Sequence, residues 1–103
     1  MFRRDIQKFS EIVMSVSKAL FEADVTGRGD FDTGSYDLEA LAVVSRLYIT
    51  NMRYVTVEDA DHALRETFSY FYFPELVELI SWKSLATSTS DRYNNIVNDG
   101  CTV

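Results

Sequence analysis

The feature that most constrains the fold is a long apolar stripe at helical spacing near the start of the chain. Apolar residues recur there at alternating intervals of four and three, and two more widen the stripe: Phe2, Ile6, Phe9, Val13, Val16, Leu20 and Ala23, with Ile12 and Ala19. This period places the side chains on one face of an α-helix. The sequence therefore predicts an amphipathic helix of about six turns that buries one face in a core.

A segment rich in glycine and aspartate follows at residues 24–37 and is expected to be a loop, because no periodicity crosses it. A second helix is predicted at 36–50, capped by Ser35 or Asp37. Its inward candidates are Leu38, Leu41, Ala42 and Leu47. Residues 46–57 have a hairpin as an alternative, since several of them favour strands. The helix, followed by a short extended piece at 53–55, is the preferred interpretation.

Two further helices are predicted on either side of the only proline. Thr56 and Asp59 have the spacing of a capping box, and an inward stripe follows: Val57, Ala60, Leu64, Phe68 and Phe71. Pro74 forces Phe73 out of helical geometry and suits the first position of a fourth helix, with these buried candidates: Leu76, Val77, Ile80 and Leu85.

The last part of the chain becomes polar from Thr87. We therefore predict a single helical domain at 1–86 and a flexible polar tail at 87–103, with one short helix around Tyr93 to Val97 as the alternative. The expected fold class is mainly α, a small bundle of four helices, or five if the last one forms.

Size and charge limit the function. The 103 residues suit one domain, and 47% hydrophobic with 25% charged residues suits a folded one. Of the net charge of −6, residues 1–55 carry −1 (seven basic, eight acidic) and residues 56–103 carry −5 (three basic, eight acidic). An acidic half repels phosphate backbones, so direct nucleic-acid binding is not expected, whereas a basic protein surface is a suitable partner.

Neither a membrane nor an extracellular setting is expected. Cys101 is the only cysteine, so no disulfide can form within the chain. The longest aliphatic run, residues 40–44, is far shorter than a membrane span. The prediction is a cytoplasmic protein, which includes the cytosol of an infected host.

Five of the fourteen aromatic residues fall within the six positions 68–73. Neighbouring side chains on a helix point about 100° apart, so these rings cannot all face one core. Tyrosine and other aromatics are enriched at binding hot spots. We therefore predict that Tyr70, Phe71, Tyr72 and Phe73 bind a partner; the alternative is that the cluster closes the core.

An acidic group surrounds the aromatic cluster in the sequence: Glu58, Asp59, Asp61, Glu66, Glu75 and Glu78. As a partner-binding set, these carboxylates would steer a basic protein surface toward the aromatic residues. The alternative role for the first three is to stabilise the positive end of a helix dipole.

The sequence does not predict an enzyme, a cofactor or a metal site. No serine or cysteine lies in a recognisable nucleophile motif. His62, with Asp59 and Glu66 on the same helical face, offers a weak metal-binding alternative, because one helix rarely completes a site.

These features favour a non-enzymatic protein-binding inhibitor or adaptor that occludes its partner, and a phage-encoded antagonist of a host defence system is the specific hypothesis. The first alternative is a homo-oligomeric structural or assembly subunit. The second is a small metal-binding protein that uses His62.

Overall fold

The computed structural model describes residues 3–25, 36–51 and 53–98, with side chains from residue 7 onward. Five helices lie in these ranges: α1 (Arg3–Ala23), α2 (Asp37–Thr50), α3 (Val57–Phe71), α4 (Pro74–Leu79) and α5 (Trp82–Asn98). The predicted mainly-α bundle is thus confirmed, in its five-helix form. No strand occurs within the described ranges, so α2 and an irregular connection replace the hairpin alternative.

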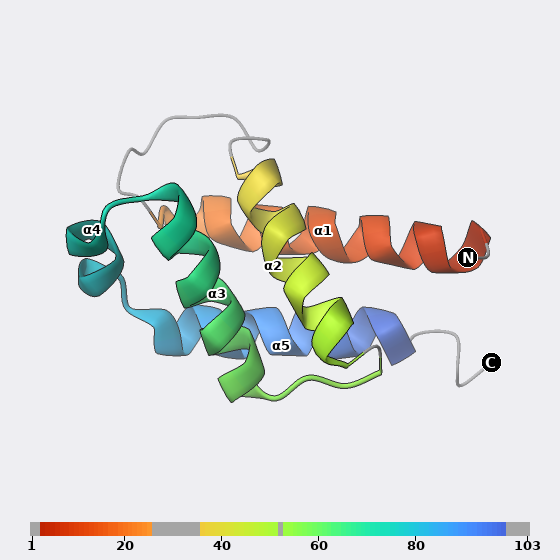
Figure 1. Cartoon of the computed structure of the whole chain (residues 1–103). Coiled ribbons are helices and arrows are strands. Elements are labelled where there is room, and N and C mark those ends of the chain that lie inside the picture. Colours follow the sequence, from red (N-terminus) through yellow and green to blue (C-terminus); the bar gives the residue numbers. More distant parts are fainter. Residues whose placement is uncertain (1–2, 26–35, 52, 99–103) are drawn as a thin grey trace.

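Four of the helices form a closed ring of contacts. α1 packs against α2 and α5, and α3 packs against α2 and α5. Figure 1 shows α2 and α3 side by side in front of α1 and α5, while α4 projects at one end of the bundle. Because α4 packs mainly against α3, it is held by less tertiary packing than the other four helices.

The core lies between the two pairs of helices. α1 contributes much of the stripe that the sequence predicts: Ile12, Val16, Ala19 and Leu20 are buried, and Phe9 and Val13 are partly buried. Ala23, the last residue of the predicted stripe, is exposed. Large buried side chains also come from the rest of the described chain, among them Leu47, Val55, Leu64, Phe68, Val77, Trp82 and Tyr93.

The start of α3 follows the predicted capping box. The Asp59 backbone N–H donates to Thr56 Oγ1, and the Thr56 N–H donates to the Asp59 carboxylate, both at 3.0 Å. These bonds satisfy backbone donors that a helix start leaves unpaired. α3 ends at Phe71, and Pro74 begins α4, as its fixed backbone angle and missing N–H favour.

The face that α2 turns to the core differs from the prediction. Leu47 is buried as expected, but Leu38 and Leu41 are exposed. The core instead takes Ala40, Val43 and Val44. α2 is apolar on both sides, so its pattern of apolar residues does not determine which side is buried.

The segment predicted as a flexible tail from Thr87 is, up to Asn98, part of α5. This part packs against α1 and α3, and Thr89, Ser90 and Tyr93 are buried in it. The prediction failed because the segment has few aliphatic residues and is held by polar side chains. The domain therefore includes residues that the predicted boundary at 86 would leave out.

Most of the Gly/Asp-rich loop, residues 26–35, lies outside the described residues, as does Ser35, one of the two predicted caps. The other, Asp37, is the first residue of α2 rather than its cap. Its carboxylate accepts a hydrogen bond from Ser17 Oγ in α1, which ties the start of α2 to the first helix.

Candidate functional site

Three of the four predicted partner-binding aromatics are exposed at the junction between the end of α3 and the start of α4. Tyr70 and Phe73 are 80% and 79% exposed, and Phe71 is also exposed. The rings of Tyr70 and Phe71 meet edge to face, with 5.3 Å between centroids. Pro74 prevents α3 from continuing, so the chain turns here and Phe73 points away from the helix stripe. We call Tyr70, Phe71 and Phe73 the aromatic corner.

Tyr72, the fourth predicted partner-binding aromatic, belongs to the core instead. Its ring stacks on that of Phe68 at 5.2 Å between centroids, and it is only partly exposed. Its hydroxyl donates to the carboxylate of Glu39, which is itself buried in α2. Phe68 also contacts Trp82, so the inner half of the aromatic segment joins α3 to α5.

Three of the six predicted partner-binding carboxylates are engaged within the bundle. Asp59 forms the capping box. Asp61 accepts from Arg65 Nε at 2.9 Å, one turn along α3. Glu66 accepts from Arg46 Nη1 at 2.8 Å, and this ion pair joins α3 to α2. These three residues therefore serve local structure, and the charges of Asp61 and Glu66 are paired with arginines.

The other three carboxylates are exposed and have no ion pair within the described ranges: Glu58, Glu75 and Glu78. Glu75 and Glu78 lie on α4, which carries no basic residue. Because α4 directly follows Phe73, this negative charge borders the aromatic corner. Glu58 lies at the far end of α3, more than a dozen residues before Phe73, so it is separated from the corner.

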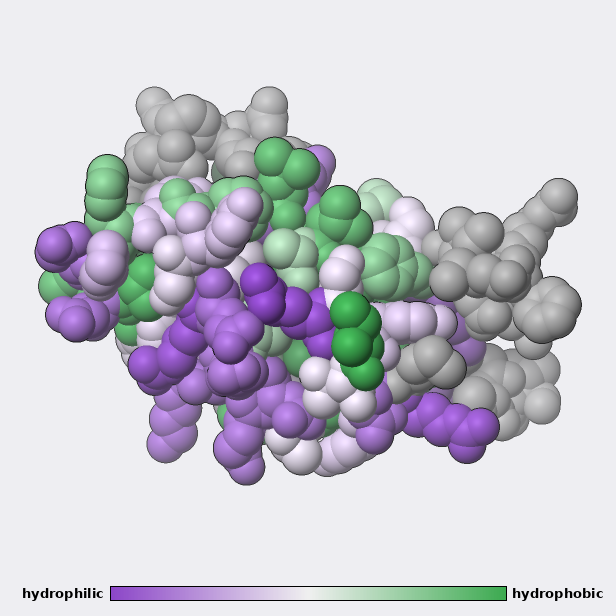
Figure 2. All heavy atoms as spheres, viewed as in Figure 1, coloured by the Kyte–Doolittle hydropathy of each residue, from purple (hydrophilic) through white to green (hydrophobic). Residues whose placement is uncertain are grey.

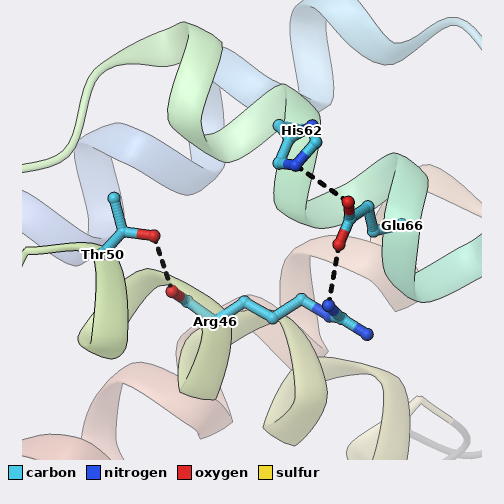
Figure 3. Close-up of polar contacts among 4 residues, drawn as sticks. All are labelled: Arg46, Thr50, His62 and Glu66. Carbon is cyan, nitrogen blue, oxygen red and sulfur yellow. Dashed lines mark hydrogen bonds and ion pairs between the residues drawn. The ribbon is translucent and has the colours of Figure 1, made fainter.

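His62 takes part in a small surface network. Its Nε2 lies 2.9 Å from Glu66 Oε1, while the other oxygen of Glu66 accepts from Arg46 (Figure 3). Asp59, the third residue of the predicted metal-binding set, is committed to the capping box. Within the described ranges no cluster of three or more histidine, cysteine, aspartate or glutamate residues is arranged to hold a metal ion.

A second exposed apolar surface, which the sequence analysis did not identify, runs along α2. Its largest members, Leu38 and Ile49, are 68% and 85% exposed, and Leu41 lies between them. Figure 2 shows hydrophobic residues in a row over α2, beside mostly hydrophilic residues over the adjoining part of α3. The sequence does contain a signal for this surface: α2 has more apolar residues, on more sides, than a single core-facing stripe requires.

A cleft of about 590 Å³ lies between the end of α1, α4 and the first half of α5. Leu76, Ile80 and Leu85 form its apolar wall, and Ser84 and Arg92 lie on the polar side. Arg92 is committed to α1: its Nη1 donates to the carbonyl and the hydroxyl of Ser15 at 3.0 Å each. The guanidinium of Arg92 in this cleft is therefore held by the first helix.

In the part of the chain that the structure describes, no helix is both long and apolar enough to cross a membrane. No family model, curated protein or solved structure matches the chain. The described part of the bundle presents two exposed apolar surfaces, the aromatic corner and the exposed side of α2.

Proposed function

We propose that this chain is a protein-binding module that attaches to its partner through the aromatic corner. The observation that carries the proposal is the exposure of Tyr70 and Phe73, each about four-fifths open to solvent, on either side of a fixed bend. Burying one large apolar side chain contributes about 1.5–3 kcal/mol, so leaving these in water forgoes stabilisation that a partner can provide.

The corner is supported by a rigid base, which favours binding. Phe68, next to it in α3, is fully buried, and Tyr72 stacks on Phe68 and bonds to Glu39. The exposed rings therefore extend from a segment that Phe68 and Tyr72 anchor in the core. Aromatic side chains on a fixed backbone lose little conformational entropy on binding, which is why such residues dominate many interfaces.

The charge next to the corner indicates what kind of protein it would bind. Glu75 and Glu78 are exposed on α4, and residues 56–103 carry a net charge of −5. A partner surface with an apolar patch bordered by lysine or arginine would complement this arrangement. The carboxylates would accelerate the encounter, and the buried rings would slow dissociation.

In this proposal the chain acts by occlusion, as an inhibitor or adaptor that covers a functional surface of its partner and needs no catalytic group of its own. Its specific form is a phage-encoded antagonist that covers a basic surface of a host defence protein, in the host cytosol. The small size, the acidic second half and the exposed aromatic corner support this form.

The test uses the double variant Tyr70→Ala/Phe73→Ala and the control Met14→Ala, which removes another exposed apolar side chain from α1. Each is used to capture proteins from the native host, and the captured partner is then purified and titrated. We expect the corner variant to weaken the dissociation constant by about 30-fold or more, as for interface hot spots, and the control to leave it unchanged.

The electrostatic part is tested separately with Glu75→Gln/Glu78→Gln. These changes should lower the association rate at low salt and leave the dissociation rate unaltered. A partner that binds the wild type and the Tyr70→Ala/Phe73→Ala variant with equal affinity would refute the proposal.

A further inference from the structure

α2 has two apolar faces, of which the bundle uses one. On a helix with 100° per residue, Leu38, Leu41, Ala42, Ser45 and Ile49 fall within an arc of about 100°. Ala40, Val43, Val44 and Leu47 lie on the opposite side and are buried. We call the first set the outer face of α2. Four of its members follow intervals of four, three and four, which is the spacing by which one helix packs against another.

We propose that the outer face of α2 binds the same face of a second copy of this chain, with the two α2 helices antiparallel. The pairing has a two-fold axis between residues 43 and 44, and it is distinct from the aromatic corner. It would leave the corner of each copy available for the partner described above.

The order of side-chain sizes along the outer face fits such a pairing. Along its central line, large residues stand at the two ends, Leu38 and Ile49, and the small residues Ala42 and Ser45 stand between them, while Leu41 lies at one edge of the face. In the antiparallel arrangement, Leu38 meets Ile49 of the second copy, and Ala42 meets Ser45. Small residues at the crossing let two helix backbones approach closely, while the large ones at both ends cover the remaining surface.

The charges at the ends of the outer face also complement a reversed copy. Asp37, whose carboxylate also accepts from Ser17, lies exposed at the start of α2, and Arg53 lies exposed just past its end. Neither has an ion pair in the described ranges. Reversal brings the acidic end of one copy toward the basic end of the other. It also sets the positive end of one helix dipole beside the negative end of its neighbour.

The charges beside the two apolar surfaces differ, and this difference indicates that each surface suits a different kind of partner. Arg46, next to the outer face, is neutralised by Glu66 at 2.8 Å, so the outer face has nearly balanced charge. The aromatic corner instead adjoins Glu75 and Glu78 on a helix without basic residues. Two copies would repel one another locally at the corner, whereas the described residues of the outer face add no such local excess of carboxylates.

The first test is the molar mass in solution, measured by sedimentation velocity in a dilution series that reaches about 1 mM, because small interfaces give weak dimers. We expect the wild type to shift from the mass of one chain to that of two. Leu38→Gln/Ile49→Gln should remain monomeric with unchanged helical circular dichroism, since both side chains are exposed. Tyr70→Ala/Phe73→Ala should dimerise like the wild type.

A wild type that stays monomeric over the whole series overturns the proposal. So does a mass above that of two chains, because a two-fold interface closes at the dimer. Association that persists in Leu38→Gln/Ile49→Gln, or that Tyr70→Ala/Phe73→Ala abolishes, locates the interface elsewhere and also overturns it.

A second test locates the two-fold axis. In a Cys101→Ser background, Ser45→Cys places a thiol about one helical turn from its counterpart in the pairing, within reach of a disulfide. Ser84→Cys, an exposed position on α5, is the matched control. Under mild oxidation we expect Ser45→Cys to give the covalent dimer at least about 10-fold faster than Ser84→Cys. Equal rates would contradict the antiparallel pairing.

Discussion

The side-chain amide of Asn94 in α5 forms two hydrogen bonds with the backbone of a single residue, Val55. The Val55 N–H donates to Asn94 Oδ1, and Asn94 Nδ2 donates to the Val55 carbonyl, both at 2.8 Å. Val55 is fully buried in the extended connection between α2 and α3. The amide therefore satisfies a backbone segment that has no neighbouring strand, and it closes the bundle at this end.

We expect Asn94→Ala to lower the free energy of unfolding by about 2–4 kcal/mol, because both backbone groups of Val55 would lose their partner in a buried position. Chemical denaturation measures the change. Asn95→Ala is the matched control, since Asn95 is exposed on the same helix and should change stability by less than about 0.5 kcal/mol. Equal denaturation midpoints for the two variants would show that the amide contacts contribute nothing.

The two neighbouring tyrosines of the aromatic segment should respond differently to truncation. Tyr72→Ala removes a ring stacked on Phe68 and leaves the buried Glu39 without this donor, so we expect a loss of about 2–4 kcal/mol in stability. Tyr70→Ala removes an exposed ring and should cost less than about 0.5 kcal/mol. Thermal and denaturant unfolding of the pair measures the difference. A large loss for Tyr70→Ala would mean that the aromatic corner is part of the core.

Two buried threonines provide a test in the stabilising direction. Thr67 Oγ1 and Thr89 Oγ1 are buried without a hydrogen-bond partner in the described structure. Thr67→Val and Thr89→Val keep the shape and remove an unsatisfied hydroxyl, so each should be neutral or raise stability by up to about 1 kcal/mol. Thr89→Ser, which keeps the hydroxyl and deletes a methyl group, should destabilise instead. A clear loss with both valines would imply that the hydroxyls have a partner.

Stability should fall at high pH because of Tyr93. Burial, followed by interaction with Tyr48, raises the pKa of the Tyr93 phenol from 10.0 to about 12. The unfolded chain loses this proton near pH 10 and the folded chain only near pH 12, so the stabilisation is complete below pH 10. It decreases by roughly 2 kcal/mol as the pH rises from 10 to 12.

This decrease is measured as the free energy of unfolding against pH, relative to Tyr93→Phe, which has no proton to lose at that position. The variant also loses the hydrogen bond from the Tyr93 hydroxyl to the Asn51 carbonyl, a constant offset of about 1 kcal/mol below pH 10. As the pH rises from 10 to 12, the stability advantage of the wild type should therefore fall through zero and reverse, leaving the wild type about 1 kcal/mol less stable than Tyr93→Phe near pH 12. A difference that stays constant over this range would show that the phenol titrates at its ordinary pKa.

Several elements could be predicted because their signals are local. The alternating stripe from Phe9 to Leu20 specifies α1, and the Thr56–Asp59 pair specifies the start of α3. The bend before Pro74 follows from the geometry of proline itself. That bend also places Phe73 off the core-facing stripe of α3, so its exposure could be anticipated without knowing the neighbouring helices.

Other features depended on contacts between distant residues. Tyr70 and Tyr72 are alike in the sequence, and only the position of Phe68 and Glu39 decides that Tyr72 is the one drawn into the core. The exposed carboxylates of α4 and the neutralised Glu66 are likewise distinguished only by where Arg46 lies.

The sequence alone determined that the chain is helical, where α1 and α3 run and that the chain bends at Pro74, because periodicity, capping and proline geometry act over a few residues. Only the tertiary structure decided which side of α2 is buried and that residues 87–98 are helical. The apolar residues of α2 would suit a core on either side of the helix. The contribution of Asn94 to stability depends on its hydrogen bonds to the backbone of Val55, 39 positions away in the chain. Such contacts have no local pattern, and they leave the outer face of α2 and the aromatic corner exposed.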